Sequence, residues 1–492
     1  MGVVAGVVLA VLIARVALSL RPPSLAVPLE WTALTGVTII NPGRDRRDNQ
    51  TLTMRDGRIE SITDRVPDAQ LRVRARAFEH RYVLPGLIDM DVRRMPSVEH
   101  LQALFGAFFL YAGVTTVREV GGLDDGVVAL RRRIDAGELP WPRLIACGRA
   151  AGGPVPPCPG SRTVRDAAAA RTAVDDLAAT GANCVAVDRT LTADALAALR
   201  AAAAAKQLPL VGEVPASVPL AESALDDVFL VSAAPPAAPA QRLADWLRGW
   251  QALDGAGIDA LVASSDPNGR AYTSSLSRWS QLARLEDPTL SQDPMLALLP
   301  RFYRDVLWPR QVASLVGGAP GVTPAGAPGR VEPATLAAAV AAMRLTVQRL
   351  HGAGARVHVG TGTPSPYVVP GVSTWSEMLS LTAAGFSLDE AWVAATRAAG
   401  ESLGIPQLGT LEPGAPADLL IFGKDPTQDP AALMTLEAVV TRGRLYPKVV
   451  LNAYVVGYAR YVQGAVYERL SMLLARLSAW WAGDARGGCE TL

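Results

Sequence analysis

The stretch Tyr82-Val83-Leu84-Pro85-Gly86-Leu87-Ile88-Asp89 separates two parts of the chain that have different patterns. Before it lie short β-branched and apolar runs joined by turns, and Asp56-Gly57 is typical of a two-residue hairpin loop. After it, strand-like runs alternate with Ala- and Leu-rich helical runs over about 320 residues, a pattern typical of a βα barrel. The stretch therefore predicts the boundary between a small β module and an α/β barrel.

The barrel pattern can be followed along the chain. The expected strands beyond the boundary are residues 115–120, 144–147, 184–187, 208–214 and 356–360. The expected helices are residues 124–136, 161–180, 192–206 and 333–351. Near the end, residues 408–414 and 417–422 are again strand-like, and we expect this last β segment to pair with the first module.

The composition excludes several classes of protein. The chain has 492 residues, with 47 Lys and Arg against 46 Asp and Glu, which gives a net charge of +1. Because no overall charge would hold the chain on a polyanion, a nucleic-acid partner is disfavoured. The hydrophobic content of 50% excludes a mostly disordered chain, and the lack of several long apolar stretches excludes a polytopic transporter.

The N-terminus predicts a membrane anchor. Residues 3–14 are all apolar or Gly, and the run resumes after Arg15 at residues 16–20. As a helix, these ~19 positions span about 28 Å, close to the hydrocarbon thickness of a bilayer. A cleaved signal peptide fits less well because no basic residue precedes Arg15, and a buried helix would need a partner for Arg15. We expect an uncleaved, single-pass anchor in a bacterial-type inner membrane, with Arg15 and Arg21 favouring a cytoplasmic barrel.

The four cysteines form no disulfide framework or zinc motif. Cys147 and Cys158 could pair in an oxidising compartment. We expect unpaired thiols in the core instead.

Four blocks of sequence carry a resemblance to a known family. They are Val83-Leu84-Pro85-Gly86-Leu87-Ile88-Asp89, Gly113-Val114-Thr115-Thr116-Val117-Arg118, Val359-Gly360-Thr361-Gly362-Thr363-Pro364, and Gly409-Thr410-Leu411-Glu412-Pro413-Gly414 with Ala417-Asp418-Leu419. In this order and spacing, they resemble the amidohydrolase superfamily, and within it the imidazolonepropionase-like and Xaa-Pro dipeptidase-like hydrolases. The resemblance implies a TIM-like (β/α)8 barrel with a composite β-sandwich built from both flanks.

We therefore divide the chain into five parts. These are a transmembrane anchor (1–22), the N-terminal part of the sandwich (31–85), the barrel (86–404), the C-terminal part of the sandwich (405–447) and an amphipathic helical tail (448–492).

The resemblance also implies a metal centre whose ligands this chain lacks. Members of the superfamily hold one or two divalent cations with a His-x-His pair, a carboxylated Lys, two later His and an Asp, and the metal activates water for hydrolysis. At the positions of the His-x-His pair, this chain has Asp91 and Arg93. It has Ala186 at the position of the Lys, Glu213 at that of the first later His, and Gly362 at that of the Asp. The next His is missing from residues 229–232. We expect no catalytic residue and no metal cofactor.

The histidine count agrees with this expectation. The chain has His80, His100, His351 and His358, and only His358 lies near the end of an expected barrel strand. A lone His there is typical of a packed or hydrogen-bonded core residue. No Gly-x-Ser-x-Gly elbow offers a nucleophile in place of the metal.

The residues at the vacated positions have a chemistry of their own. Arg93 brings a permanent cation to the barrel mouth, and Asp91, Glu213 and Glu119 bring carboxylates that can pair with it. These four residues predict an internal ion-pair plug. The alternative is that these positions drifted to solvated polar residues without a common role. A third possibility is that the carboxylates do general acid–base work or bind Mg²⁺ or Ca²⁺, although the positive charge of Arg93 would repel a cation.

The tail predicts an amphipathic helix of about 30 residues. Its apolar and aromatic stripe comprises Tyr454, Tyr458, Tyr461, Leu470, Leu473, Leu474, Leu477, Trp480 and Trp481. The aromatic tip favours contact with a membrane or a partner over packing on the barrel. The tryptophans Trp246, Trp250, Trp279 and Trp308 are expected in the core, with an interface as the alternative.

These observations predict a catalytically inactive, membrane-anchored structural or assembly subunit of a larger membrane complex, of respiratory or photosynthetic type. Its expected partners are other subunits of that complex and the lipid bilayer. One alternative is a protein that binds a ligand in the old pocket beside the loop 363–370 without cleaving it. The other is a metal-dependent amidohydrolase with altered ligands.

Overall fold

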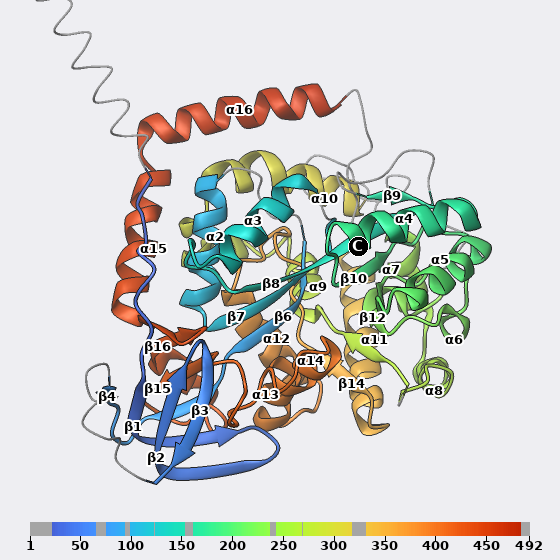
Figure 1. The fold of residues 1–492 in the computed structure, drawn as a ribbon. Coiled ribbons are helices and arrows are strands. Elements are labelled where there is room, and N and C mark those ends of the chain that lie inside the picture. The colour runs from blue at the N-terminus through green and yellow to red at the C-terminus, as the bar shows by residue number, and fades with distance from the viewer. Residues whose placement is uncertain are drawn as a thin grey trace, which may run out of the picture.

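The computed structural model describes residues 22–64, 75–93, 99–122, 124–152, 161–236, 243–267, 269–316 and 331–483. Two sheets organise this part of the chain (Figure 1). One is a mostly antiparallel sheet built from both flanks of the chain, and the other is a parallel sheet that forms the barrel. The TIM-like barrel and the composite β-layer predicted from the sequence are confirmed.

The composite sheet has the strand order β17-β16-β15-β5-β1-β2-β3. Its strands are β1 (Ala33–Asn41), β2 (Asp45–Arg55), β3 (Arg58–Thr63), β4 (Ala75–Ala77), β5 (Tyr82–Pro85), β15 (Leu419–Phe422), β16 (Leu436–Thr441) and β17 (Arg444–Pro447), and β4 pairs with β1. Antiparallel pairing of β5 with β15, with Val83 opposite Ile421, joins the N-terminal and C-terminal flanks. The hairpin predicted at Asp56-Gly57 joins β2 to β3.

The barrel strands follow one another in sequence order, and each pair is parallel. They are β6 (Leu87–Val92), β7 (Val114–Glu119), β8 (Arg143–Ala151), β10 (Cys184–Val187), β11 (Leu210–Gly212), β12 (Asp227–Phe229), β13 (Ala271–Thr273) and β14 (Arg356–His358), with the short β9 (Arg162–Thr163) beside β8. The segment after β14 returns to β6, where Met90 N donates to Val359 O at 2.9 Å and Gly362 N donates to Asp91 O at 2.7 Å. The sheet therefore nearly closes on itself.

The helices cover the outside of the barrel. They are α2 (Glu99–Tyr111), α3 (Asp125–Asp135), α4 (Ala167–Ala179), α5 (Ala193–Ala205), α6 (Leu220–Ser223), α7 (Leu243–Ala252), α8 (Gly255–Ala263), α9 (Leu276–Ala283), α10 (Trp308–Val316), α11 (Pro333–Gly352), α12 (Val372–Ala383), α13 (Leu388–Ala395) and α14 (Arg397–Ser402). Local signals start several of them: Asp124 caps α3 by accepting from Val127 N at 2.9 Å, and Ser387 and Glu390 form a capping box on α13. The helices predicted at 124–136, 192–206 and 333–351 match α3, α5 and α11 within one residue.

The expected tryptophan core is confirmed. Trp246, Trp250, Trp279 and Trp308 are each at most 2% exposed. Trp250, Trp279 and Trp308 pack into the hydrophobic layer between the barrel and its helices. Trp246 lies in α7 and is buried against the loops that follow β11 and β12. Their side chains are therefore not available as an interface.

The tail departs from the single predicted helix. It consists of α15 (Lys448–Val462) and α16 (Ala465–Gly483), which meet at a corner at Gly464 (Figure 1). The inner face of α15 packs against α2, and Tyr454 and Tyr458 are buried at 7% and 0% exposure. These two tyrosines, predicted as partner contacts, lie within the fold because α15 covers the barrel. The side chains of Trp480 and Trp481 lie outside the described residues.

The predicted localisation is corrected. Within the described ranges, no helix is both long enough and apolar enough to cross a membrane, which conflicts with a single-pass inner-membrane protein. Apart from Pro22, the predicted anchor at residues 1–22 lies outside the described residues.

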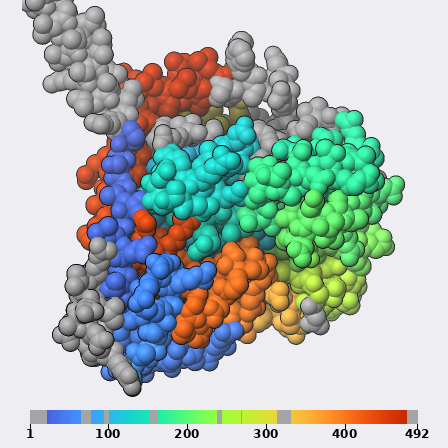
Figure 2. Space-filling model, in the orientation of Figure 1, coloured from blue at the N-terminus to red at the C-terminus, as the bar shows by residue number. Residues whose placement is uncertain are grey.

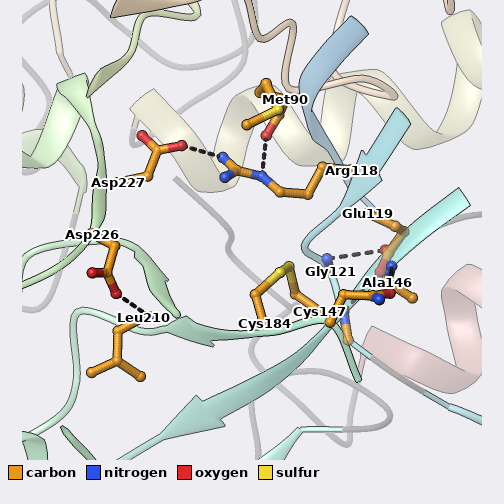
Figure 3. The surroundings of a disulfide bond; sticks show 12 residues. Met90, Arg118, Glu119, Gly121, Ala146, Cys147, Cys184, Leu210, Asp226 and Asp227 are labelled. Carbon is orange, nitrogen blue, oxygen red and sulfur yellow. Dashed lines mark hydrogen bonds and ion pairs between the residues drawn. A yellow bond between two sulfur atoms is a disulfide. The ribbon is translucent and has the colours of Figure 1, made fainter. Parts of the chain in front are cut away.

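The cysteine prediction also requires correction. Cys147 and Cys184 form a disulfide across the neighbouring strands β8 and β10, where they are direct register partners with a Cα–Cα distance of 4.5 Å (Figure 3). Unpaired core thiols were expected, or a pair between Cys147 and Cys158, and Cys158 lies outside the described residues. Sequence separation hid the true pair, because only the barrel register brings two cysteines 37 residues apart onto adjacent strands.

Candidate functional site

The residues at the vacated ligand positions converge at one end of the barrel. Asp91 and Arg93 lie at the end of β6, Glu213 directly follows β11, Gly362 follows β14, and Ala186 lies in β10. Because the carboxyl ends of parallel strands meet at one mouth, these positions face the place where active sites of such barrels form. The structure therefore brings together the residues that the sequence analysis selected.

Arg93 is held between two carboxylates. Its guanidinium makes a bidentate contact with Asp91, with Nε 2.6 Å from Oδ1 and Nη2 3.1 Å from Oδ2. Its Nη1 lies 3.7 Å from Glu213 Oε1. The guanidinium also lies over the Phe229 ring, 4.9 Å from its centroid. All three side chains are nearly inaccessible to solvent, so Arg93 seals the mouth rather than extending from it.

Glu213 is shared by further arginines. Arg149 Nη2 and Arg189 Nη1 lie 3.9 Å and 3.8 Å from Glu213 Oε2, and Arg189 N donates to the same oxygen at 3.3 Å. Arg149 also forms an ion pair with Asp188. Burial acts to raise the pKa of Asp188, but the charges of Arg149 and Arg189 outweigh it and hold this pKa below its usual value. Asp188 is therefore a counter-ion and not a proton donor at neutral pH.

Glu119 contributes to the same charge pattern from a different position. Its carboxylate accepts backbone hydrogen bonds from Gly121 N at 3.0 Å and Gly122 N at 3.4 Å. Its charge is among those that raise the pKa of Arg149. Glu119 thus orders the turn after β7 while it adds a negative charge to the barrel mouth.

Arg278 is a member of the site that sequence reasoning missed. It lies in α9, directly after β13, and its side chain is 2% exposed. Burial and the neighbouring charge of Arg93 lower the pKa of Arg278 to about 9, which shows how unfavourable a further positive charge is here. Arg278 belongs to no recognisable sequence motif. The only signal for it in the sequence is Gly362, which has no side chain and so leaves room at the barrel mouth for one from another element.

A second layer of charges lies deeper in the barrel. Arg118 spans the interior, with Nη2 2.7 Å from Asp227 Oδ2 and Nε donating to Met90 O at 2.8 Å (Figure 3). His358 Nδ1 lies 3.3 Å from the same carboxylate. Burial acts to raise the pKa of Asp227, but the interactions with Arg118 and His358 outweigh it, so the pKa of Asp227 is lowered. His358 is fully buried and hydrogen-bonded through both ring nitrogens, as predicted for a core histidine.

Ser402, His358 and Asp227 have the order of a nucleophilic triad, with Ser402 Oγ 2.9 Å from His358 Nε2. The surroundings oppose that role. Ser402 is the last residue of α14, where helices present carbonyl groups, and the next two backbone N–H groups are already bonded to Ala399 O and Glu401 O. These two N–H groups are therefore engaged and not available to an oxyanion, which favours a structural hydrogen-bond chain.

Together these residues form what we call the barrel ion network. It comprises Arg93, Arg118, Arg149, Arg189 and Arg278 with Asp91, Glu119, Asp188, Glu213 and Asp227, and each is at most 7% exposed. Within this set, five guanidinium groups accompany five carboxylates, so their formal charges are equal in number. A divalent cation does not fit this donor set, because Asp91, Asp188, Glu213 and Asp227 each already face an arginine. Among the described residues, no group of three or more His, Cys, Asp or Glu is arranged to hold a metal.

The network leaves no ligand pocket at its centre. The space between Asp91, Arg93, Phe229, Arg278 and Trp279 has no volume into which the centre of a water molecule fits. Side chains therefore fill the space between these five residues.

Comparison with known proteins supports the fold. Residues 327–446 match the amidohydrolase family model, while a search of curated proteins found no match. A putative prolidase from Bifidobacterium longum is 23% identical and has a TM-score of 0.63, covering 88% of this chain and 99% of its own. A Xaa-Pro dipeptidase with bound methionine is 17% identical with a TM-score of 0.61, covering 85% and 99%. The bottromycin amidohydrolase is 20% identical with a TM-score of 0.64, covering 94% and 93%.

This chain is therefore amidohydrolase-like. The C-terminal part of its barrel and sandwich carries the family's sequence pattern, and the described fold is that of prolidase-like amidohydrolases. The predicted resemblance is confirmed.

Proposed function

We propose that this chain is an amidohydrolase-like protein that does not hydrolyse its family's substrates. The observation that carries the proposal is the bidentate contact of Arg93 with Asp91, beside Glu213, at the mouth where the family's metal ligands stand. Hydrolysis of an amide needs an activated water and a polarised carbonyl, and a metal with an open coordination position supplies both in such enzymes. Arg93 and Arg278 occupy that region with fixed positive charge.

The buried arginines also argue against the two alternatives. A protein that binds its ligand in the old pocket would need open space beside Arg93 and Trp279, and that space is filled. An enzyme with altered ligands would need carboxylates free to coordinate a cation, whereas Asp91 and Glu213 are engaged by arginines. The barrel is better suited to a structural role.

We further propose that this role is that of a structural or assembly subunit in a larger protein complex. The support is the outer face of α16, where Leu470, Leu473, Leu474 and Leu477 are between 42% and 65% exposed. Exposed apolar groups in such a row are typical of surfaces that are covered by another segment or protein. The inert barrel would then act as a rigid base for that contact.

Metal analysis combined with assays tests the loss of hydrolysis. The full chain, produced with added zinc and manganese and purified without chelators, is expected to hold well below one metal ion per molecule. It should cleave no Xaa-Pro dipeptide, lactam or ester, and chelation should leave its melting temperature unchanged. A metal-dependent prolidase of the same fold, treated in parallel, is the positive control. One or two bound metal ions, lost together with activity on chelation, would refute the proposal.

A further inference from the structure

A hollow lies between the composite sheet and the barrel. Its volume is about 330 Å³, within the range of small-molecule sites. Its walls come from the N-terminal segment at Val27, the loop between β2 and β3, the turn after α3 and the loop between β16 and β17. Figure 2 shows blue, cyan and red parts of the chain in contact on one face of the molecule. Arg143, the first residue of β8, lines the hollow, so it lies at the opposite end of the barrel from the ion network.

Four arginines line this cavity, which we call the arginine hollow. They are Arg58, Arg143, Arg442 and Arg444. Three carboxylates also line it, but Asp56 and Asp135 are exposed at its rim, and Glu30 already has a partner. The negative charges therefore lie nearer to solvent than the arginines, apart from Arg58, which is also exposed.

Arg444 has no counter-charge within the part of the chain that the structure describes. No described group forms a hydrogen bond or an ion pair with its guanidinium, which lines the hollow. Its Nη2 lies 3.1 Å from the point that a Cβ atom on Gly137 would occupy. The glycine thus lets the guanidinium lie against the turn after α3. A guanidinium held in this way is a binding group for an oxyanion.

Two further arginines add positive charge behind Arg444. The buried Asp418 lies between them, with Oδ2 3.2 Å from Arg143 Nη2 and with Oδ1 accepting from Arg442 N at 2.8 Å. Arg442 also reaches Asp135 Oδ1 at 3.4 Å, but the side chain of Asp135 is 62% exposed. Burial and the neighbouring charge of Arg143 lower the pKa of Arg442. The inner part of the hollow therefore has more positive than negative charge, which a bound anion would reduce.

The rest of the wall is apolar and aromatic. Trp141 and Tyr446 are 1% and 3% exposed, and Val27 and Leu139 lie beside them. An inorganic ion would leave this wall uncovered, whereas an organic body would cover it. Arginines beside an apolar wall therefore fit a small organic anion better than an inorganic one.

We propose that the arginine hollow binds a small organic anion, whose carboxylate or phosphate group pairs with Arg444 and whose apolar body lies against Trp141 and Leu139. Guanidinium groups bind both kinds of oxyanion through paired hydrogen bonds. Because the walls come from both flanks and from the barrel, the ligand would hold these three parts together. The site is independent of the loss of hydrolysis, since it lies away from the barrel mouth.

Calorimetric titration of the full chain with defined probes tests the site. Benzoate and phenyl phosphate each carry an oxyanion on an apolar ring, and at least one of them should bind; the tighter one identifies the preferred oxyanion. Benzyl alcohol, which has the ring without the charge, and inorganic phosphate, which has the charge without the ring, should each bind several-fold more weakly. No binding of either anionic probe, or equal binding of benzyl alcohol or inorganic phosphate, would overturn the proposal.

Substitution of Arg444 tests its role. Arg444→Met removes the charge and should weaken binding of the tighter probe about tenfold, while Arg444→Lys should restore part of the loss. Arg171→Met is the matched control, because Arg171 is an exposed arginine of α4 away from the hollow, and it should bind as the original chain does. Equal binding by Arg444→Met and the original chain would overturn the proposal.

Arginine labelling of the original chain gives a readout that needs no variant. Phenylglyoxal should modify the unpaired guanidinium of Arg444, and the tighter probe should slow this modification several-fold, as peptide mass spectrometry would measure. Labelling of Arg171 should not change and serves as the internal control. Labelling of Arg444 at the same rate with and without the probe would place the probe elsewhere and overturn the proposal.

Discussion

The Cδ atom of Arg278 lies 2.8 Å from the point that a Cβ atom on residue 362 would occupy. Gly362 stands where the amidohydrolase resemblance places the last metal ligand, an Asp, and its φ of +68° is one that glycine adopts without strain. The missing side chain is what admits Arg278 to the mouth of the barrel. The absence of a side chain at position 362 and the presence of Arg278 at the barrel mouth therefore depend on each other.

A methyl group at position 362 should destabilise the fold through this contact. We expect Gly362→Ala to lower the free energy of unfolding by about 2–4 kcal/mol, from overpacking against Arg278 together with the positive φ. Gly404→Ala is the matched control, because Gly404 has a φ of +66° and no atom lies within 4 Å of the point that its Cβ would occupy. Urea denaturation of both variants isolates the packing cost.

The contact itself can be verified by a double-mutant cycle. Arg278→Ala removes the atom that the new methyl group meets, so Gly362→Ala should cost less in that background than in the original chain. If the two substitutions are additive, Arg278 does not occupy the space that Gly362 leaves.

Neutralising the shared carboxylate should disrupt the barrel ion network. Glu213→Gln keeps the shape of the side chain but leaves Arg93, Arg149 and Arg189 short of a counter-charge, and we expect a loss of about 3–5 kcal/mol of stability. Asp48→Asn, which breaks the exposed pair with Arg46, is the control and should cause no measurable change. Equal effects of both substitutions would show that the buried charges do not act as a network.

The sequence was sufficient for the broad fold and for part of the site. Alternating strand and helix runs predicted the barrel, and the vacated positions led to Asp91, Arg93 and Glu213, which the structure places in contact. These predictions succeeded because strand ends in a barrel share one mouth, so that chain position determines spatial position.

The remaining members of the site depend on long-range packing. Arg278 reaches the site from α9. Arg149 and Asp188 form an ion pair because the register of β8 and β10 places them side by side. The Cys147–Cys184 pair depends on the same register. The sequence also did not predict that the tail turns between two helices. Tyr454 and Leu473 fit one continuous apolar pattern, but the corner at Gly464 places them on different helices.

The buried carboxyl group of Asp89 should make stability depend on pH. Burial raises its pKa to about 7, although Thr361 N and Thr361 Oγ1 donate to it at 3.0 Å and 2.7 Å. Because the folded pKa lies above the unfolded value, folding takes up a proton between about pH 4 and pH 7. The stability from this group is complete below pH 4 and is lost as the pH rises through 7.

Comparison with Asp89→Asn measures this effect. Relative to the variant, which carries no titrating group there, the original chain should lose about 2–3 kcal/mol of stability between pH 5 and pH 8. Urea denaturation of both proteins across this range provides the test. A difference that does not vary with pH would show that Asp89 stays ionised throughout.

The disulfide should stabilise the barrel. Replacing Cys147 and Cys184 together with Ala should lower the free energy of unfolding by about 2–4 kcal/mol, because the bond closes a loop across 37 positions of the unfolded chain. Thiol labelling of the unreduced, denatured chain should find only Cys158 and Cys489 reactive. Labelling of all four cysteines would contradict the disulfide.

Truncation of the tail should affect stability differently at two positions, Pro447 and Gly464. The family resemblance alone predicts that a chain ending at Pro447 keeps its barrel intact, because the family's barrel closes without a tail. The structure reverses this expectation for α15. Its buried side chains are Leu451, Tyr454, Val455, Tyr458, Ala459 and Val462. Lys448 Nζ also donates to Tyr111 O, at the end of α2, and lies 3.2 Å from the centroid of the Tyr111 ring.

A chain that ends at Pro447 should therefore expose the covered face of α2 and lose about 5 kcal/mol or more, enough to unfold a marginally stable domain. A chain that ends at Gly464 keeps α15 and loses α16, whose buried contacts with the barrel include those of Tyr467 and Glu468, so its unfolding midpoint should stay close to that of the full chain. Thermal denaturation followed by near-ultraviolet circular dichroism distinguishes the two. If the chain ending at Pro447 unfolds as cooperatively and at the same temperature as the chain ending at Gly464, α15 is an appendage and the burial of Tyr454 and Tyr458 does not support the barrel.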